Sequence, residues 1–277
     1  MDNYKILNFH PIFAENAFCL SKRLGIEIIT DFAPQEGYTY LVFGGHEQAH
    51  QLLTIQIRQR NFNYIIMNSE PPLSQFLKNK YYISLMRSNV VFDYHKVSAE
   101  HLTTLGIRVL NQFIFEFVYS PGLIERDIDI MFIGSRTPRR EAIYQSLKTR
   151  YPDKRIIFHF EWGLTDQVEL TKELQRAKVL LNIPYHTHNI LESHRINKGL
   201  ASGCQVVSLY SGHKETDDLY SKYVHFTHDF FEHFDSDDML PEHLMEKKQK
   251  YPALIGELNK YTSQLQWILE QLNTVNV

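Results

Sequence analysis

The chain has 277 residues, of which 43% are hydrophobic, so it can bury two small cores and is not expected to be globally disordered. Its 29 basic and 32 acidic residues leave a net charge of -3, which argues against a general nucleic-acid binder. Cys19 and Cys204 are too few for a disulfide framework and indicate a reducing compartment. Neither a signal peptide nor an apolar run of about 18 residues is visible, so we expect a cytoplasmic protein.

Apolar runs alternate with amphipathic segments through the first half of the chain. The apolar runs are continuous, which is typical of strands in a parallel, doubly wound sheet buried on both faces. Gly25 and Gly106 are expected to end helices, and Pro71-Pro72 to end a strand and open a long helix through about Arg87. We expect strands over 4–9, 26–30, 39–43, 64–68, 89–94 and 107–111, and helices over 14–24, 46–60, 71–87 and 97–106.

A break at 120–123 precedes a second series of alternating strands and helices, which predicts a second wound sheet with a boundary near residue 121. Its strands are expected over 127–135, 155–160, 178–185 and 204–210, and its helices over 137–151, 165–177 and 189–203. Residues 226–250 predict irregular structure with short helices, and 251–273 an amphipathic helix carrying Trp267. The fold class is therefore α/β with two Rossmann-like parallel-sheet domains, 1–121 and 122–250, followed by a C-terminal helix over 251–277.

Ligands of doubly wound sheets bind at the carboxyl ends of the strands, and one strand end of the second half is rich in phosphate-binding groups. Gly134, Ser135 and Arg136 follow a strand and open a helix that also carries Arg140. A glycine lets the backbone approach a ligand, while helix amides and guanidinium groups hydrogen-bond phosphate oxygens. The alternative is an ordinary strand-to-helix turn with solvated arginines.

A second strand of this half ends in further polar residues. Asn182 lies near its end, His186 follows it, and Glu192 and Arg195 come next on the expected helix. Glu192 and Arg195 are three residues apart, so they share a helix face. They form either part of a ligand site or a routine surface ion pair.

Three segments resemble glycosyltransferases with the GT-B fold, of the bacterial group 1 type. NIPYHTHNILESHRINKGLASGCQVVS is similar to their donor-binding segment, DIDIMFIGSRTPRRE to the strand and arginine pair that open the donor domain, and NYIIMNSEPP to a strand of the first domain. The resemblance covers about half of the chain. It implies two domains facing a cleft, with the C-terminal helix packing back on the first domain.

The resemblance implies a nucleoside-diphosphate sugar as co-substrate, of UDP or GDP type, with no cofactor and no metal ion. Gly134 to Arg136 would lie near the diphosphate, and Glu192 would bind ribose or sugar hydroxyls. Arg195, with Arg136 or Arg140, would stabilise the leaving diphosphate, because fixed cations can stabilise that charge without a metal.

The same resemblance implies further residues of the sugar-donor site and the class of acceptor. Asn182 and His186 would also line the donor site, and residues 158–163 would lie near the base. The acceptor would be a glycan, a lipid-linked molecule or a protein, with peripheral membrane association left open and no nucleic-acid partner. A non-catalytic nucleotide-sugar-binding subunit of the same fold is an alternative.

The sequence departs from the family in two places. Many retaining members carry Glu-x7-Glu, but Gly199 and Leu200 stand where a second carboxylate would follow Glu192, and His10-Pro11 replaces a glycine-rich loop. Retention and inversion are therefore both open. The candidates for a base that deprotonates the acceptor are His10 and Glu70, with Asp93 as a weaker one, although a turn or a cap explains the first two equally well.

Two short motifs indicate other chemistry. His46-Glu47-Gln48-Ala49-His50 matches H-E-x-x-H, which on a helix would make a zinc site and a zinc-dependent hydrolase. Asp127-Ile128-Asp129 is a literal D-x-D, but it precedes a strand, so its carboxylates are expected at the amino end of the sheet, away from any ligand. The run from 235 to 238 is expected to be a solvated loop.

Overall fold

The computed structural model describes residues 3–30, 32–59, 62–122, 125–160, 166–186, 190–234 and 251–275. The chain divides into two compact units: unit 1 is Met1–Glu116 with Glu257–Val277, and unit 2 is Phe117–Gly256. Each unit has its own sheet, and every strand pairing in these ranges is parallel, as the continuous apolar runs predicted. In the part of the chain that the structure describes, no helix has both the length and the hydropathy that a bilayer span requires.

The sheet of unit 1 has six strands in the order β2-β1-β3-β4-β5-β6. The strands are β1 (Tyr4–Asn8), β2 (Glu27–Ile29), β3 (Thr39–Phe43), β4 (Asn63–Asn68), β5 (Val90–Asp93) and β6 (Val109–Gln112). The chain winds from β1 to β2 in one direction and from β3 to β6 in the other. The winding therefore reverses between β1 and β3, and such a reversal is where doubly wound sheets bind their ligands.

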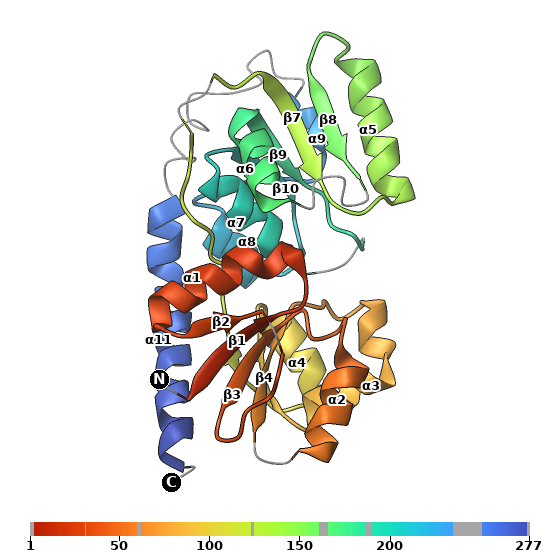
Figure 1. The fold of residues 1–277 in the computed structure, drawn as a ribbon. Helices are drawn as coiled ribbons and strands as arrows, with labels where there is room; N and C mark the ends of the chain where they lie inside the picture. The colour runs from red at the N-terminus through yellow and green to blue at the C-terminus, as the bar shows by residue number, and fades with distance from the viewer. Residues whose placement is uncertain are drawn as a thin grey trace. The chain divides into compact units, whose positions relative to one another are not determined.

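Helices cover both faces of this sheet (Figure 1). Alternate side chains of β3 and β4 point to opposite faces: Tyr40 and Tyr64 join the core under α2, α3 and α4, while Phe43 and Met67 lie beside α1 and α11. The helical elements are η1 (Pro11–Phe13), α1 (Ala14–Leu24), α2 (Ala49–Arg58), η2 (Gln75–Lys78), α3 (Lys80–Arg87), α4 (Lys96–Thr104) and the C-terminal α11 (Tyr251–Val275).

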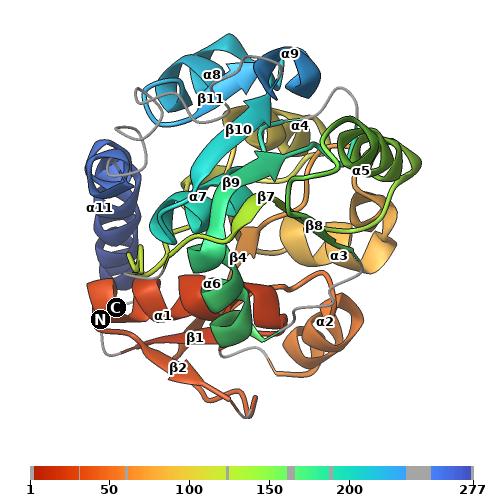
Figure 2. The same cartoon turned by 90° about the horizontal axis from the view of Figure 1, so that it is seen from above.

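The C-terminal helix α11 packs on the first unit, as the fold class predicted. The Tyr4 hydroxyl donates to the carbonyl of Leu269 at 2.7 Å, and Arg23 on α1 hydrogen-bonds Asn259. Both views show α1 and α11 side by side (Figures 1 and 2). The helix thus closes the face of the sheet that α2, α3 and α4 leave open.

The sheet of unit 2 has five strands in the order β11-β10-β9-β7-β8. The strands are β7 (Ile128–Ile133), β8 (Ile156–His159), β9 (Ala177–Asn182), β10 (Gln205–Leu209) and β11 (His225–Thr227). The helices are α5 (Pro138–Arg150), α6 (Gln167–Arg176), α7 (Ser193–Ala201), α8 (Lys214–Tyr220) and α9 (Phe230–Phe234). The winding reverses between β7 and β9, while α8, β11 and α9 gather beyond β10 (Figure 2).

Two predictions for helix starts in unit 1 are wrong. The helix expected over 46–60 begins at Ala49, because Gly44 adopts a φ of 67° and the chain turns before the helix can start. The helix expected directly after Pro71-Pro72 is replaced by η2 and then α3, each with its own side-chain cap, from Ser74 and Asn79 respectively.

Three differences concern unit 2. The strand expected over 178–185 ends at Asn182, and the helix expected over 189–203 begins at Ser193, so Glu192 is the residue before the helix and not part of it. Helix α8 and strand β11 were missed, since neither has a long periodic pattern. Part of the segment 226–250 and the run 235–238 lie outside the described residues.

Replacing Leu265 of α11 by alanine should lower the free energy of unfolding by about 3 kcal/mol, because this side chain is only 1% exposed and its removal leaves a cavity. Trp267 on the same helix is 60% exposed and provides the matched control, with an expected change within about 0.5 kcal/mol for Trp267→Ala. Urea unfolding followed by circular dichroism measures both. Equal losses would contradict the packing described for α11.

Candidate functional site

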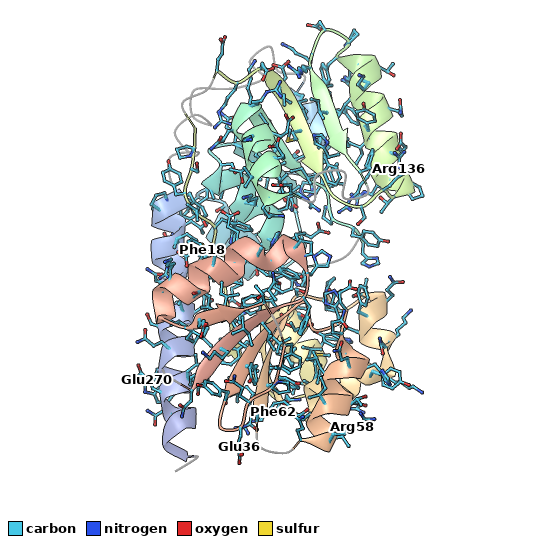
Figure 3. The ribbon with its side chains drawn as sticks, viewed as in Figure 1. Phe18, Glu36, Arg58, Phe62, Arg136 and Glu270 are labelled. Atoms are coloured by element: carbon cyan, nitrogen blue, oxygen red, sulfur yellow. The ribbon has the colours of Figure 1, made fainter. Side chains whose placement is uncertain are left out.

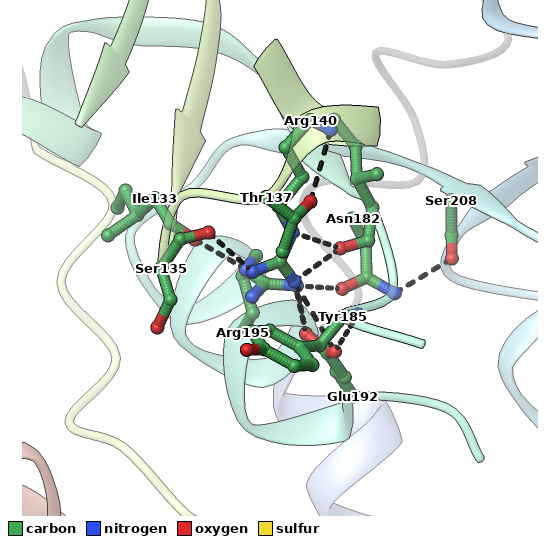
Figure 4. Close-up of polar contacts among 10 residues, drawn as sticks. Ile133, Ser135, Thr137, Arg140, Asn182, Tyr185, Glu192, Arg195 and Ser208 are labelled. Carbon is green, nitrogen blue, oxygen red and sulfur yellow. Dashed lines mark hydrogen bonds and ion pairs between the residues drawn. The ribbon is translucent and has the colours of Figure 1, made fainter. Parts of the chain in front are cut away.

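The predicted donor residues of unit 2 meet where the winding of its sheet reverses, between β7 and β9. Gly134 to Arg140 follow β7, and Asn182 to Arg195 follow β9. Figure 4 shows side chains from both segments converging on two guanidinium groups. Ligand sites of doubly wound sheets form at such a reversal.

Arg140 is the most buried arginine of this group, at 1% exposure. Its Nε and Nη2 donate to the carbonyl of Ile183 at 3.1 and 2.6 Å, and Nη1 donates to the carbonyl of Ser135 at 2.8 Å. Nη2 also lies 3.3 Å from the carboxylate of Glu192. Arg140 therefore joins the loop after β7, the end of β9 and the start of α7, so it positions the site (Figure 4).

Arg195 enters the same cluster from the first turn of α7. Its Nε donates to the carbonyl of Ile133 at 2.7 Å, and Nη1 donates to Asn182 Oδ1 at 2.6 Å and lies 2.5 Å from Glu192 Oε2. Among the described residues no hydrogen bond is found for Nη2, the remaining end of the guanidinium group. That end is the one placed against Gly134.

Gly134 is the position that lets this guanidinium end lie against the backbone. Its φ is 152°, and a Cβ atom there would come within 2.8 Å of Arg195 Nη2 and 3.0 Å of the Phe132 ring. Any side chain at this position would be strained and would displace Arg195. The absence of a side chain at Gly134 therefore lets Arg195 and Arg140 pack directly against the backbone of this loop.

Glu192 balances the two guanidinium groups. Burial acts to raise its pKa, but the charges of Arg195 and Arg140 outweigh that effect, so the pKa lies below its usual value. Burial, together with the charge of Arg195, lowers the pKa of Arg140 to about 10, and the group stays protonated at neutral pH. The three side chains thus carry a net charge of +1 at pH 7, which suits an anionic ligand.

The other predicted donor residues lie around this cluster. Asn182 is fully buried and donates to Ser208 Oγ at 2.9 Å, which orients its oxygen toward Arg195. Ser135 contributes its carbonyl to Arg140. His186 packs its ring on Tyr185 with centroids 4.7 Å apart. The structure therefore brings Gly134, Ser135, Arg140, Asn182, Glu192 and Arg195 together.

Arg136 lies apart from the buried pair. Its side chain is 53% exposed, pairs with Glu141 at 2.6 Å and stacks over the Phe160 ring at 4.6 Å (Figure 3). Phe158 and Phe160 pack edge to face at the end of β8, with ring centroids 5.7 Å apart. The rest of the predicted base-side segment, 161–163, lies outside the described residues.

Two residues of the cluster, Tyr185 and Phe132, were not predicted from the sequence. The backbone N–H of Tyr185 donates to Glu192 Oε1 at 2.6 Å, and its ring lies over Arg140 at 5.4 Å. The Phe132 ring lies 4.9 Å from the guanidinium carbon of Arg140 and 5.0 Å from that of Arg195. Its negative face stabilises both cations. A lone aromatic residue inside an apolar strand carries no signal for such a role.

Of the predicted catalytic residues of unit 1, His10 lies at the corresponding reversal, between β1 and β3. His10 follows β1, and His46 follows β3, with ring centroids 6.5 Å apart. Gly44 makes this approach possible, because a Cβ there would come within 2.9 Å of His10 Cβ. His10 Nδ1 accepts the backbone N–H of Ile12 at 3.2 Å, so the neutral ring carries its proton on Nε2.

Glu70 joins these histidines from the end of β4. Its Oε1 lies 3.3 Å from His46 Nδ1, and its Oε2 accepts the Ser74 hydroxyl at 2.5 Å. Burial raises the pKa of Glu70, while burial and the nearby His10 lower the pKa of His46 to about 4. His46 is therefore neutral at pH 7, and the raised pKa makes Glu70 a stronger proton acceptor than an ordinary carboxylate.

Asp93, at the end of β5, supports this cluster through Asn68. It is fully buried, and its Oδ2 accepts from Asn68 Nδ2 at 2.7 Å and from Ser98 Oγ at 2.9 Å. Burial raises its pKa to about 7. Asn68 in turn donates to the carbonyl of Glu70 at 3.1 Å, so Asp93 helps to fix the backbone of Glu70, one of the two predicted bases.

The alternative of a zinc site at H-E-x-x-H does not fit the geometry of the described residues. Helix α2 begins at Ala49, so His46 and Glu47 lie in the preceding turn, and His50 packs its ring on Tyr81 at 4.6 Å. Across the described ranges, no group of three or more His, Cys, Asp or Glu side chains is arranged to hold a metal ion.

The D-x-D motif, Asp127-Ile128-Asp129, lies at the amino end of the unit 2 sheet, as the sequence predicted. Asp127 pairs with Arg155 and with Arg176, and Asp129 pairs with Lys178 at 2.7 Å, all at the amino end of the unit 2 sheet. The bond from Arg176 holds the pKa of Asp127 at about 2. The two carboxylates thus neutralise basic side chains at the edge opposite to the site.

Comparison with solved structures finds this fold in proteins of low sequence identity. TarM matches with a TM-score of 0.57 and 11% identity over 87% of this chain, which spans only 55% of the TarM chain. HepE of Anabaena, in complex with UDP and glucose, matches with a TM-score of 0.57 and 7% identity over 95% of this chain and 99% of its own. A HepE structure with UDP-glucose matches with a TM-score of 0.55 and 10% identity, over 95% and 99% of the two chains.

No protein-family model matches the sequence, and neither does any curated protein. The structural similarities cover both units and, with the two separate parallel sheets, confirm the predicted GT-B fold. A fold shared at such identity does not by itself assign an activity, so the activity has to be argued from the site.

Replacing Glu192 by glutamine should lower the free energy of unfolding by about 3 kcal/mol at pH 7, because Arg140 loses its buried counter-charge. Since the folded pKa of Glu192 is depressed, its contribution is complete above the unfolded pKa of about 4.3 and is lost as the pH falls through the folded value. Urea unfolding at pH 7 and at about pH 3 measures the difference.

The matched control is Glu141→Gln, which breaks the exposed pair with Arg136 and should change the free energy by less than about 1 kcal/mol. A loss for Glu192→Gln that is no larger than for Glu141→Gln would contradict the central place of Glu192 in the cluster.

Proposed function

We propose that the protein is a glycosyltransferase that moves a sugar from a nucleoside-diphosphate sugar to a hydroxyl acceptor. The observation that carries this proposal is Arg195 Nη2, which lies against the backbone of Gly134 and has no hydrogen bond among the described residues, within a cluster of net charge +1. A diphosphate is the ligand whose charge and oxygen geometry fit such a group best. The HepE structures with UDP and UDP-glucose support a uridine donor.

The donor side of the reaction belongs to unit 2. Departure of the nucleoside diphosphate builds negative charge on the β-phosphate, and Arg195 stabilises that charge in place, because Ile133, Asn182 and Glu192 already hold its other nitrogens. No metal ion is needed for this step. Glu192 has oxygen lone pairs beyond those used by its protein partners, and these accept a sugar or ribose hydroxyl.

The acceptor side belongs to unit 1. Glu70 takes the proton of the attacking hydroxyl, and the neutral His46 beside it shields the carboxylate from water. His10, with its proton on Nε2, donates a hydrogen bond that orients the acceptor or the sugar. A glycan, a lipid-linked molecule or a protein can supply the hydroxyl, and the proposed site of action is the cytoplasm.

Arg195→Ala should weaken UDP binding by about 1.5–3 kcal/mol, that is, roughly tenfold to 150-fold, because a charged hydrogen bond to the diphosphate is lost. Isothermal titration calorimetry with UDP, in the presence and absence of EDTA, measures the affinity. The matched control is Arg155→Ala at the amino end of the same sheet, which should bind UDP as the parent protein does. Unchanged affinity in Arg195→Ala would refute the donor site.

Glu70→Gln should slow sugar transfer by about 10²- to 10⁴-fold while leaving UDP affinity unchanged, because the base is removed and the donor site is not. Release of UDP from UDP-glucose, with water as the acceptor, measures the rate. In the parent protein the rate should rise with pH through the raised pKa of Glu70 and then level off, and this rise should be absent in the variant.

The control for this experiment is Glu100→Gln on the exposed surface of α4. If UDP binds but neither the parent protein nor its variants release UDP from a sugar nucleotide, the protein is the non-catalytic binding subunit instead.

A further inference from the structure

One stretch of unit 1 has a charge balance unlike the rest of the chain. Between Gln48 and Phe92 there is one acidic residue, Glu70, and it is largely buried, whereas the basic residues in this stretch are Arg58, Arg60, Lys78, Lys80 and Arg87. The chain as a whole has more acidic than basic residues, 32 against 29. Within the stretch from Gln48 to Phe92, η2 and the start of α3 carry Lys78 and Lys80 and no acidic residue, so this segment is cationic.

Exposed apolar side chains lie among these cations. Leu73 is 54% exposed and Tyr81 is 38% exposed, and both Lys78 and Lys80 are exposed as well. The Lys80 ammonium lies 5.0 Å from the centre of the Tyr81 ring. We call Leu73, Lys78, Lys80 and Tyr81 the cationic rim.

The cationic rim flanks the candidate base of unit 1. It follows the carboxyl end of β4, and Phe76, in the middle of η2, packs its ring on His46 with centroids 4.5 Å apart. Ser74, between Leu73 and η2, donates to Glu70. Whatever the rim binds is therefore held next to the group that would take the acceptor's proton.

The combination of side chains distinguishes one kind of partner. A soluble polyanion is bound mainly through cationic side chains, and an exposed leucine adds nothing to that interaction. The surface of an anionic bilayer attracts lysines electrostatically and also accepts leucine and tyrosine at the level of its headgroups. Charge and apolar exposure together thus favour a membrane surface.

We propose that the cationic rim docks unit 1 on an anionic lipid bilayer. Where the proposed function holds, this docking presents to Glu70 an acceptor hydroxyl carried in the membrane. The docking itself requires neither the donor site nor catalysis, so it can be tested separately from the proposed function.

Co-sedimentation of the full chain with phosphatidylcholine vesicles, with and without phosphatidylglycerol, tests the proposal. Binding is expected only to the vesicles that contain phosphatidylglycerol, and it should fall as NaCl rises from about 0.05 M to about 0.5 M. Lys78→Gln with Lys80→Gln should reduce the partition coefficient by roughly 30-fold, about fivefold for each lysine. Leu73→Ser should reduce it further at unchanged net charge.

The matched control is Phe18→Ser with Lys22→Gln on α1, where an exposed ring also lies beside a lysine but on the other face of the sheet (Figure 3). This variant should sediment like the parent protein. Circular dichroism and UDP affinity show whether each variant is folded and keeps its donor site.

Three results would overturn the docking proposal: no binding to phosphatidylglycerol vesicles, equal loss in the α1 control, or heparin binding as tight as vesicle binding with no effect of Leu73→Ser. Each can occur while UDP binding is intact, and UDP binding can fail while docking persists. The two proposals therefore fail independently.

Discussion

The arrangement of unit 2 depends on one buried charge. The Arg140 guanidinium is 1% exposed. An unpaired charge at such a position would strongly destabilise the folded state of a small domain. It is stable there because two backbone carbonyls, the Glu192 carboxylate and the Phe132 ring surround it. Those same partners bring the loop after β7 to the end of β9, and so they shape the site before any ligand arrives.

In the proposed reaction Arg195 binds the diphosphate, while Arg140 holds the surrounding loops in place. Glu192 is shared between the two, and its depressed pKa keeps it charged, so each guanidinium group has a carboxylate oxygen beside it while the cluster keeps a net charge of +1. An arginine that is held at Nε and Nη1 needs little reorganisation when charge develops near its Nη2. Such preorganisation is what makes fixed cations effective in stabilising a leaving group.

Both units use a glycine at the reversal of their winding. Gly44 lets the loops after β1 and β3 approach each other, and Gly134 lets Arg195 Nη2 lie against the backbone. The side chains at the two reversals nevertheless differ. In unit 2 two guanidinium groups share one carboxylate. In unit 1 buried carboxyl groups lie near neutral imidazoles. This division matches what transfer of a sugar requires, namely a stabilised leaving group and a group that accepts a proton.

The sequence by itself determined the local features of this protein. Continuous apolar runs predicted parallel strands, Gly25 marked the end of α1, and Thr137-Pro138 opened α5, because strand burial, helix caps and proline geometry act within a few residues. The clustering of polar residues after β7 and β9 also predicted where a site would form. These are properties that neighbours along the chain decide.

Only the tertiary structure decided which of these residues does what. Arg136 and Arg140 are equivalent in the sequence, yet one is exposed and the other is buried, because the partners of Arg140 come from Ile183, 43 residues away. His46 looked like a helical zinc ligand and instead meets Glu70 from another strand. Burial and counter-charges come from segments far apart in the chain, and it is they that set the pKa of Glu192, Glu70 and His46 and hence the chemistry of each site.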